Sequence, residues 1–308
     1  MILVTGASGM LGYYVIKQLS EQDVSVTHLS SRNMPKYVPE HFNWSALDLS
    51  AEFDENTLDE LFPGTTAIFH LGATVPRKGI NPDDSEIFQA NVGAVQKLAS
   101  WALDRNIYFV FISGATVYKD AYAAKIKEDA LLGPSIDSNF YGYSKVLAEN
   151  TLEFYRSRGL ELCTLRPSSI YGYGLAKEKM IRHFLGTLFQ GRELELKPPT
   201  NDTINLIYAD DVATAILQAH GKKVTGIFNL ANKDGTSVLS IAETCRDIVR
   251  AGDIKVTEGS DKFTATKSRF NLDSTAAHSS FNFKAKYSIE QGLEDLLAND
   301  HEFKSLRV

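Results

Sequence analysis

The segment ILVTGASGMLGYYVIKQL, residues 2–19, places three glycines between an apolar strand and an amphipathic helix. Gly6, Gly9 and Gly12 have the spacing G-x-x-G-x-x-G, and the turn between them also contains Ser8, Met10 and Leu11. Such glycines allow a tight turn, a close approach to a pyrophosphate and close packing of helix on strand, while the helix N-terminus faces the anion. A tight turn without a ligand is the alternative. Because strand, turn and helix agree, the segment predicts a dinucleotide-binding α/β fold.

Apolar runs alternate with helical stretches through the first two-thirds of the chain, which predicts parallel strands joined by helical crossovers. Asn91–Leu103 and Tyr141–Arg158 have helical periodicity, and Gly159 would end the second helix. The expected strands are Ile2–Thr5, Val24–Leu29, Phe42–Leu47, Thr66–Leu71, Ile107–Ser113, Glu161–Pro167 and Gly226–Leu230, with a further strand and helix in Ile204–Gly221.

We therefore expect a Rossmann α/β fold, a doubly wound parallel sheet with a smaller, mostly helical C-terminal substrate lobe. Residues 1–167 would form the dinucleotide-binding domain, to which residues 203–232 return. Residues 168–202 and 233–308 would form the substrate-binding lobe.

Composition limits the class of partner. A net charge of -6 provides no basic surface for nucleic acid or anionic lipid, so a small soluble substrate is expected. The two cysteines and seven histidines show no disulfide framework and no metal-ligand spacing, so no metal site is predicted. No apolar run approaches the length of about 20 residues that a membrane helix needs. The first strand begins at Ile2, which leaves no room for a signal peptide, and we expect a cytoplasmic protein.

The end of the second strand bears on cofactor choice. An acidic residue about 20 positions after the glycine turn would hold the adenine ribose and favour NAD. Ser31 and Arg32 lie there instead, and Arg32 could pair with a 2′-phosphate, so NADP is slightly favoured over NAD. The alternative is that Arg32 is a solvated loop residue. Asp48 would meet the adenine or cap a turn.

Tyr141 and Lys145 are four residues apart and therefore share one face of the predicted helix. The pKa of a free tyrosine is about 10, and a neighbouring ammonium and an oxidised nicotinamide would both favour the phenolate. This arrangement predicts a proton donor and acceptor.

Taken together, these motifs resemble the extended short-chain dehydrogenase/reductase family, in its NAD-dependent epimerase/dehydratase branch, over nearly the whole chain. The resemblance implies Tyr141 as acid/base and Lys145 as a ligand of the nicotinamide ribose. It also implies cofactor contacts from Leu49, Leu71, Gly72, Ala73 and Pro167, and a homodimer formed through the helices 91–103 and 141–158. The matching stretches are TGASGMLG at 5–12, DL at 48–49, HLGA at 70–73, NVGA at 91–94, SGATVY at 113–118, YGYSK at 141–145, LRPSSIYGYG at 165–174, LIYADDVA at 206–213 and FNLAN at 228–232.

Gly114 departs from this pattern, because members of the family usually have Ser or Thr there to steady the substrate oxygen. The nearest hydroxyls are those of Ser113 and Thr116. If the chain stays extended, Thr116 lies on the same face as residue 114 and Ser113 on the opposite face. We therefore expect Thr116, or else Ser113, to supply the missing hydroxyl.

Two further departures concern the substrate. Ile204 and Ser169 stand where nucleotide-sugar enzymes of this family often have a diphosphate-binding arginine and an asparagine. Arg182, His183 or Arg192 would have to supply compensating charge. Further pocket candidates follow the sixth predicted strand: Arg166, Ser168 and Tyr171, the last of which is equally consistent with the core.

Structural roles are expected for several other polar residues. Asp210 and Asp211 would cap a helix that begins at Val212. His70 would be a packed histidine, and Asn91 a structural hydrogen-bonding residue near the catalytic helix.

Three functions remain open at this point. The first is an NAD(P)-dependent enzyme that acts on a nucleotide sugar, by 4-epimerisation with Tyr141 as acid/base, by dehydration or by reduction of a keto-sugar. The second is an NADPH-dependent reductase of a small ketone or aldehyde. The third is a non-catalytic dinucleotide-binding regulator, which Gly114 suggests and the pair Tyr141 and Lys145 disfavours.

Overall fold

The computed structural model describes residues 1–22, 27–76, 82–134, 139–257, 266–300 and 302–303. Its centre is a seven-stranded sheet of order β11-β6-β5-β4-β1-β2-β3, in which every neighbouring pair is parallel. The order reverses at β1, so a crevice opens beyond the carboxyl end of that strand. The strands are β1 (Ile2–Thr5), β2 (Thr27–Ser31), β3 (Asn43–Ala46), β4 (Ala67–His70), β5 (Tyr108–Ile112), β6 (Leu162–Pro167) and β11 (Gly226–Leu230).

The doubly wound parallel sheet predicted from the sequence is confirmed. The strands β1, β4, β5 and β6 are buried along their whole length, which explains why each reads as a continuous apolar run. The predicted strand Val24–Leu29 begins outside the described residues, and β2 ends two residues later, at Ser31.

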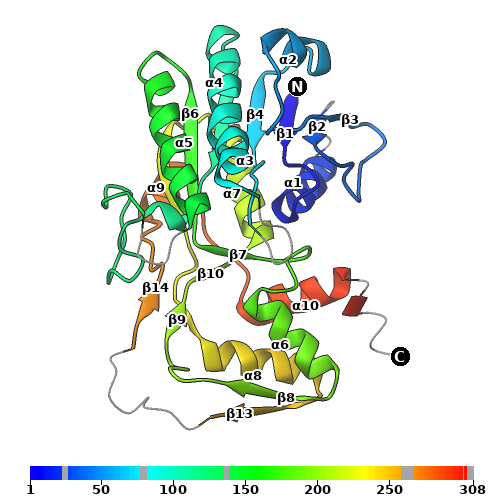
Figure 1. Ribbon diagram of the computed structural model, residues 1–308, viewed down its shortest axis with the longest axis vertical. Coiled ribbons are helices and arrows are strands. Elements are labelled where there is room, and N and C mark those ends of the chain that lie inside the picture. Colours follow the sequence, from blue (N-terminus) through cyan, green and yellow to red (C-terminus); the bar gives the residue numbers. More distant parts are fainter. Residues whose placement is uncertain (23–26, 77–81, 135–138, 258–265, 301, 304–308) are drawn as a thin grey trace.

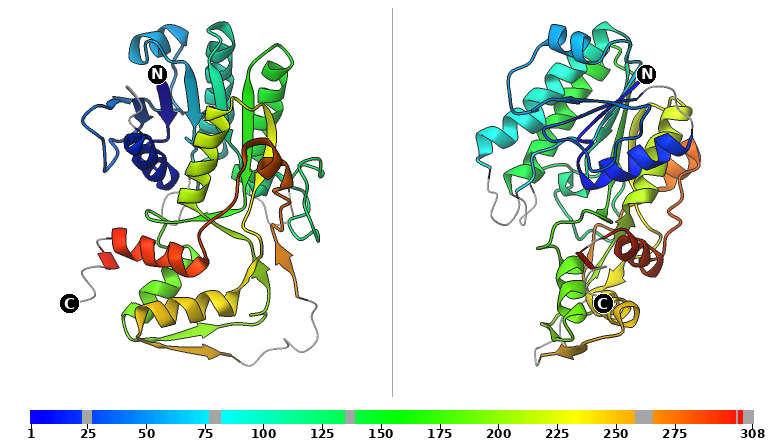
Figure 2. Two further views of the ribbon diagram at one scale, coloured as in Figure 1. Left: turned by 180° about the vertical axis from the view of Figure 1, so that it is seen from behind. Right: turned by 90° about the vertical axis from the view of Figure 1, so that its right-hand side faces the viewer.

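Helices cover both faces of the sheet (Figures 1 and 2). The helix α1 (Met10–Glu21) packs on α7 (Ala209–Gly221) over one face, and α4 (Ala94–Asp104) packs on α5 (Phe140–Arg156) over the other. The helices α2 (Glu55–Leu61) and α3 (Asp84–Phe88) precede α4, and a π-helical turn, Gln89–Gly93, joins α3 to it. The predicted helix 91–103 is therefore the later part of a longer helical segment.

The C-terminal elements gather beyond the carboxyl ends of the strands, in the lower half of Figure 1. The helices α6 (Met180–Phe189) and α8 (Val238–Val249) pack together, and α10 (Ile289–Asn299) packs on α8. This part also contains short strands, one of which is the strand expected in Ile204–Gly221. They are the pair β8 (Glu193–Leu196) and β13 (Asp253–Val256), the triplet β12 (Thr236–Ser237), β9 (Thr203–Ile204) and β14 (Ser268–Arg269), and the pair β7 (Ser169–Tyr171) and β10 (Leu206–Tyr208). The helix α9 (Thr275–Phe281) instead lies against β11 and α7.

The prediction that two aspartates cap a helix at Val212 is wrong. The helix α7 begins at Ala209, and its N-cap, Tyr208, makes no side-chain capping bond. Asp211 is buried and accepts hydrogen bonds from the backbone N–H groups of Lys286 and Tyr287, at 2.9 and 3.2 Å. This carboxylate therefore anchors the segment that leads into α10.

In the part of the chain that the structure describes, no helix is both long and apolar enough to span a membrane. The same residues contain no cluster of side chains suited to bind a metal ion.

Candidate active site

A cleft of about 670 Å³ lies at the carboxyl end of the sheet, where the strand order reverses. The glycine turn forms one wall of it. Gly6 has φ +68°, and a Cβ atom at this position would lie 2.5 Å from the backbone nitrogen of Gly72. The backbones after β1 and β4 can approach this closely because Gly6 has no side chain and can adopt a positive φ.

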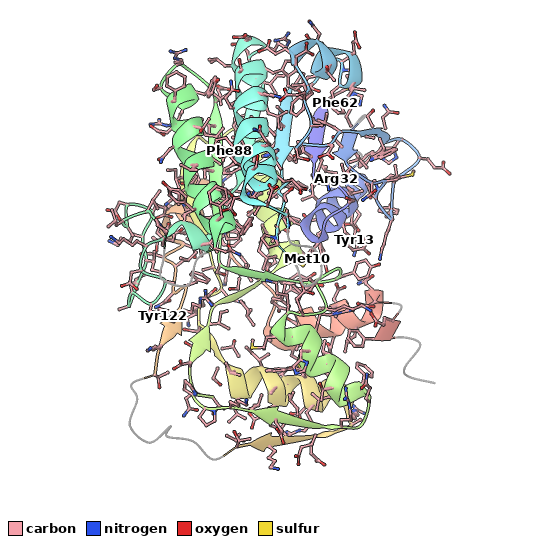
Figure 3. All side chains as sticks on the ribbon, in the orientation of Figure 1. Met10, Tyr13, Arg32, Phe62, Phe88 and Tyr122 are labelled. Carbon is pink, nitrogen blue, oxygen red and sulfur yellow. The ribbon has the colours of Figure 1, made fainter. Side chains whose placement is uncertain are left out.

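The N-terminus of α1 opens onto this cleft. Its N-cap, Gly9, makes no side-chain hydrogen bond, and no acidic residue lies in the first turn. The first N–H groups of the helix and its positive end are thus available to an anion. Figure 3 shows Met10 where this end of α1 meets the C-terminal elements. The turn therefore fits the pyrophosphate of a dinucleotide.

The structure brings most of the predicted site residues to this one cleft. Pro167 and Thr116 are not among its lining residues. The predicted residues that line it are Gly6, Ser8, Gly9, Met10, Leu11, Gly12, Ser31, Arg32, Asp48, Leu49, Leu71, Gly72, Ala73, Ser113, Tyr141 and Lys145. Lining residues that the sequence analysis missed include Thr5, Ser30, Asn33, Lys36, Thr74, Glu86 and Ile170.

Tyr141 and Lys145 lie in the first two turns of α5, which places both on the cleft. Asn139 caps this helix by accepting a hydrogen bond from the backbone N–H of Gly142. Burial raises the pKa of Tyr141 to about 12. Burial also lowers the pKa of Lys145 to about 8, against a smaller opposing effect of the Glu149 carboxylate. In this state Tyr141 is a neutral proton donor, and Lys145 carries its charge at neutral pH.

Gly114 precedes a short turn, and the expectation that the chain stays extended there is wrong. Residues Ala115–Val117 form a 3-10 turn directly after the glycine. This turn brings Thr116 Oγ1 to within 3.7 Å of the position that a Cβ atom of residue 114 would occupy. Ser113 Oγ is buried without a hydrogen-bond partner among the described residues, and Ser113 lines the cleft. Both hydroxyls thus lie next to the gap that Gly114 leaves.

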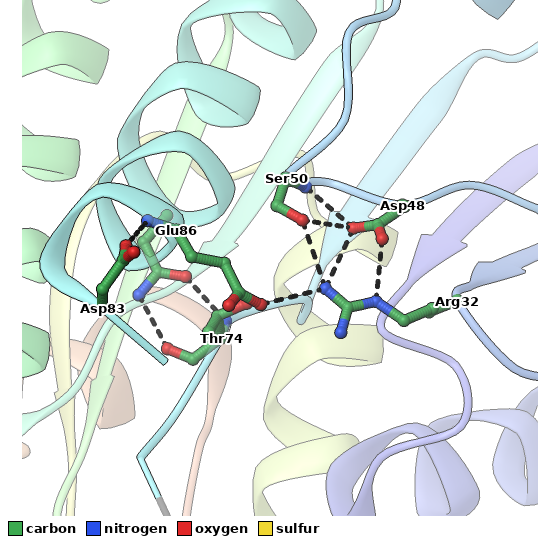
Figure 4. A network of polar contacts seen from close by, with 7 residues as sticks. Arg32, Asp48, Ser50, Thr74, Asp83 and Glu86 are labelled. Carbon is green, nitrogen blue, oxygen red and sulfur yellow. Dashed lines mark hydrogen bonds and ion pairs between the residues drawn. The ribbon is translucent and has the colours of Figure 1, made fainter. Parts of the chain in front are cut away.

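Arg32 occupies the far end of the cleft and is paired with two carboxylates (Figure 4). Its Nε lies 2.9 Å from Asp48 Oδ2, and its Nη2 lies 3.3 Å from Glu86 Oε1. Desolvation raises the pKa of Asp48, but hydrogen bonds from Ser50 and Arg32 together hold it below its ordinary value. The Arg32 side chain is 54% exposed, as expected of a solvated loop residue, but its guanidinium is already paired with two carboxylates.

Comparison with known proteins assigns the chain to a family. The model of the NAD dependent epimerase/dehydratase family matches residues 2–231. The chain belongs to this family.

Three known proteins are similar to the chain in sequence or fold. The dTDP-4-dehydro-6-deoxyglucose reductase of Escherichia coli is 27% identical over 262 residues, which are 79% of this chain and 80% of the relative. The UDP-N-acetylglucosamine 4-epimerase of Bacillus cereus has the same fold, with a TM-score of 0.81, 24% identity and coverage of 97% of this chain and 96% of the other. The UDP-glucuronic acid 4-epimerase of Bacillus cereus, solved in complex with NAD, gives a TM-score of 0.81, 19% identity and coverage of 100% and 99%.

In this epimerase/dehydratase family member, two of the cationic substrate candidates named from the sequence, Arg166 and Arg182, have protein partners, whereas His183 and Arg192 are exposed and do not line the cleft. Arg166 is 1% exposed and lies 2.5 Å from the carboxylate of Glu149. Arg182 is buried and pairs with Asp300 and Glu302. Both guanidinium groups stabilise the protein's own carboxylates, and neither faces the cleft described above.

Two of the other substrate candidates, Tyr171 and Ser168, are also held by the protein. Tyr171 is 1% exposed, and its hydroxyl donates to the carbonyl oxygen of Ser288, so it belongs to the core. Ser168 is buried and donates to Asn205 at 2.8 Å, whereas Ser169 is partly exposed in β7.

Arg269 was not predicted as a site residue. It lies beside Ile204, because β14 and β9 are parallel and pair these two residues in register. Paired residues of neighbouring strands project to the same face of a sheet. Arg269 Nε is buried without a hydrogen-bond partner among the described residues. An arginine is thus paired with Ile204, where the sequence lacks one, and its guanidinium lies 4.9 Å from the centre of the Phe270 ring.

His70 and Asn91 have the structural roles that the sequence predicts. His70 is fully buried at the end of β4, with Nδ1 2.7 Å from Thr5 Oγ1. Asn91 donates to Ser144 Oγ at 3.0 Å and accepts from the backbone N–H of Thr74 at 2.7 Å. It therefore ties α5 to the segment that follows β4.

Proposed function

We propose that the chain is a nicotinamide-dinucleotide-dependent enzyme that inverts the configuration at C4 of a nucleotide sugar, with Tyr141 as general acid and base. One observation carries the proposal: Tyr141, Lys145 and Ser113 share a single cleft with the glycine turn. Family membership and the nucleotide-sugar enzymes among the similar proteins support it. The C-terminal elements that face the sheet would hold the substrate.

The nicotinamide, Tyr141, Lys145 and a nearby hydroxyl group would each have a role in this reaction. A bound nicotinamide would accept a hydride from the sugar C4 and return it to the opposite face. Tyr141 would take the proton of the 4-hydroxyl and later give it back. To act as a base near pH 7, its pKa must fall from about 12, which corresponds to roughly 7 kcal/mol of stabilisation of the phenolate. The Lys145 ammonium on the same helix face would supply part of it, and Thr116 or Ser113 would steady the substrate oxygen.

We further propose that Arg269 meets an anionic group of the substrate. Its unpartnered, buried Nε and its place beside Ile204 support this role, because an arginine N–H bonds most strongly to a carboxylate or phosphate. Arg182 is not needed for this role, since its charge is already neutralised by Asp300 and Glu302.

A panel of UDP- and dTDP-sugars, incubated with and without added NAD or NADP and followed by proton NMR, tests the proposal. Formation of the 4-epimer without net consumption of dinucleotide is the expected result. Absence of any epimer across the panel would contradict it.

A second candidate is the reduction of a keto-sugar or a smaller carbonyl compound. The similarity to the Escherichia coli dTDP-4-dehydro-6-deoxyglucose reductase favours it, and so does the absence of a cationic side chain at Ile204. Consumption of one reduced dinucleotide per product would identify this reaction in the same experiment.

A further inference from the structure

A cluster formed by Arg32, Asp48 and Glu86 joins three separate elements at one end of the cleft (Figure 4). Arg32 follows β2, Asp48 lies shortly after β3, and Glu86 is in α3. Arg32 Nη2 contacts Asp48 Oδ1 at 3.0 Å and Glu86 Oε1 at 3.3 Å, while its Nε contacts Asp48 Oδ2 at 2.9 Å. The end of the second strand is the region that contacts the adenine ribose in dinucleotide-binding folds.

The cluster leaves Arg32 poorly suited to bind a phosphate. Bidentate recognition of phosphate by arginine uses two parallel N–H groups on one edge of the guanidinium. On Arg32 the edge formed by Nε and Nη2 is already bound to the carboxylate of Asp48, and Nη2 also contacts Glu86. Among the described residues only Nη1 has no recorded partner, so a phosphate could make a single contact there without displacing a carboxylate. Two carboxylates also face one guanidinium, so the three side chains carry a net charge of -1 (one positive, two negative).

NAD and NADP differ only in the substituent at the 2′ position of the adenine ribose. NAD has a neutral hydroxyl on the adenine ribose, whereas NADP has a phosphate with a charge near -2 at pH 7. A net-negative cluster would repel that phosphate, and a hydroxyl would meet no such penalty. We infer that Glu86, together with Asp48, holds Arg32 away from a 2′-phosphate and makes NAD the dinucleotide that this cleft prefers. The inference rests on the proposed function only in requiring that the cleft binds a dinucleotide.

Glu86 is the member of the cluster that can be changed most cleanly. Asp48 also accepts hydrogen bonds from the backbone N–H and hydroxyl of Ser50, at 2.9 and 2.7 Å, so its loss would disturb the turn after β3. The side chain of Glu86 is partly exposed and makes its one recorded bond to Arg32. Glu86→Gln keeps the size of the side chain and removes the charge.

Equilibrium binding of NAD and NADP to the complete chain, without sugar, tests the inference. Trp44 Nε1 donates to Ser31 Oγ at 3.2 Å, so a tryptophan next to the adenine end can report binding by fluorescence. In the wild type NAD should bind more tightly than NADP. Glu86→Gln should lower the ratio of the two dissociation constants, Kd for NADP over Kd for NAD, by roughly twofold to fivefold.

Two further variants show whether the effect is local and passes through Arg32. Asp84→Asn removes the same charge from the same helix, from a position outside the cleft, and should leave the ratio unchanged. In an Arg32→Gln background, Glu86→Gln should change the ratio by a smaller factor, because no guanidinium is left to release.

The outcomes separate the two proposals. Tighter binding of NADP than of NAD by the wild type, or an unchanged ratio in Glu86→Gln, overturns the inference while the proposed function stands. An equal change in Asp84→Asn, or an undiminished change in the Arg32→Gln background, also overturns it. Failure of both dinucleotides to bind would overturn the proposed function and the inference together.

Discussion

Lys145 Nζ donates a hydrogen bond of 2.9 Å to the carbonyl oxygen of Ile112, the last residue of β5. This bond fixes the ammonium at the carboxyl end of the central strand, on the same helix face as Tyr141. Because Lys145 and Tyr141 both line the cleft, the cation would be close to the tyrosine when it ionises in the proposed reaction. Burial raises the pKa of Tyr141, and it would also strengthen the attraction between the ammonium and a phenolate.

Tyr141→Phe should abolish turnover and leave dinucleotide binding intact. The substitution removes the only atom of the side chain that can exchange a proton, and loss of a general acid or base typically lowers kcat by about 10²- to 10⁴-fold. Steady-state kinetics and equilibrium binding of NAD measure the two effects. Tyr143→Phe is the matched control, because Tyr143 is 38% exposed and does not line the cleft. Equal kinetics of Tyr141→Phe and the wild type would exclude the proposed role.

Thr116→Val should lower kcat, and Gly114→Ser should restore it in the same chain. Gly114 has φ 172°, an extended conformation open to any residue, and the nearest atom to an added Cβ is Thr116 Oγ1 at 3.7 Å. A serine at position 114 thus fits and would supply a hydroxyl where Thr116 lost one. Measurement of kcat for Thr116→Val, the double variant and Ser113→Ala distinguishes the candidates. A loss of activity in Ser113→Ala alone would assign the hydroxyl to Ser113 instead.

The sequence predicted the sheet well and the charged contacts poorly. Each central strand is a buried apolar run, so its periodicity and flanking turns locate it within a few residues. The glycine turn and Tyr141 with Lys145 were also predictable, because each motif is local in sequence.

The missed or wrongly assigned residues depend on long-range contacts. Glu86 meets Arg32 across 54 positions, and Arg182 meets Asp300 across 118. Arg269 reaches Ile204 only through the register of two short strands. The sequence around a charged residue does not indicate which distant residue it pairs with. Arg182 was therefore predicted to be free to bind substrate, and Glu86 was not predicted to be a site residue.

Arg269→Gln should raise KM for a nucleotide sugar by about 10-fold or more without changing the dissociation constant for NAD. Loss of a charge-assisted hydrogen bond to a phosphate costs about 1.5 to 3 kcal/mol, which supports this magnitude. Lys267→Gln is the control for general charge, because Lys267 lies two residues away and is exposed. An unchanged KM would show that Arg269 does not meet the substrate.

Arg182→Gln should lower stability and leave KM unchanged. The Arg182 side chain is 8% exposed and pairs with Asp300, so its removal leaves a carboxylate buried without its partner. Breaking such a pair costs about 3 to 5 kcal/mol of unfolding free energy. Urea unfolding measures the loss. A large increase in KM with normal stability would return Arg182 to the substrate site.

Phe154→Glu should convert a dimer into a monomer. Phe154 and Tyr143 are 50% and 38% exposed and lie three turns apart on one face of α5, the helix through which family resemblance predicts dimerisation. Sedimentation equilibrium measures the change. Leu131→Glu, at an exposed apolar residue outside this helix, should leave the dimer intact. A monomeric wild type would contradict the prediction.

Protonation of His70 in the unfolded chain should lower the stability of the folded protein below about pH 6.5. Burial, with a smaller contribution from the Lys145 ammonium, lowers the pKa of His70 to about 3 in the folded state. The ordinary value of about 6.5 applies to the unfolded chain, so between these two pH values the unfolded state binds more protons, and stability falls as pH falls. Between pH 7.5 and pH 5 this linkage amounts to about 2 kcal/mol of unfolding free energy. His70→Asn cannot protonate, so urea unfolding should show a loss over this range that is smaller by about that amount than in the wild type. Because His28 and His220 also have lowered pKa values, the difference between the two proteins isolates His70, and equal losses would contradict the assignment.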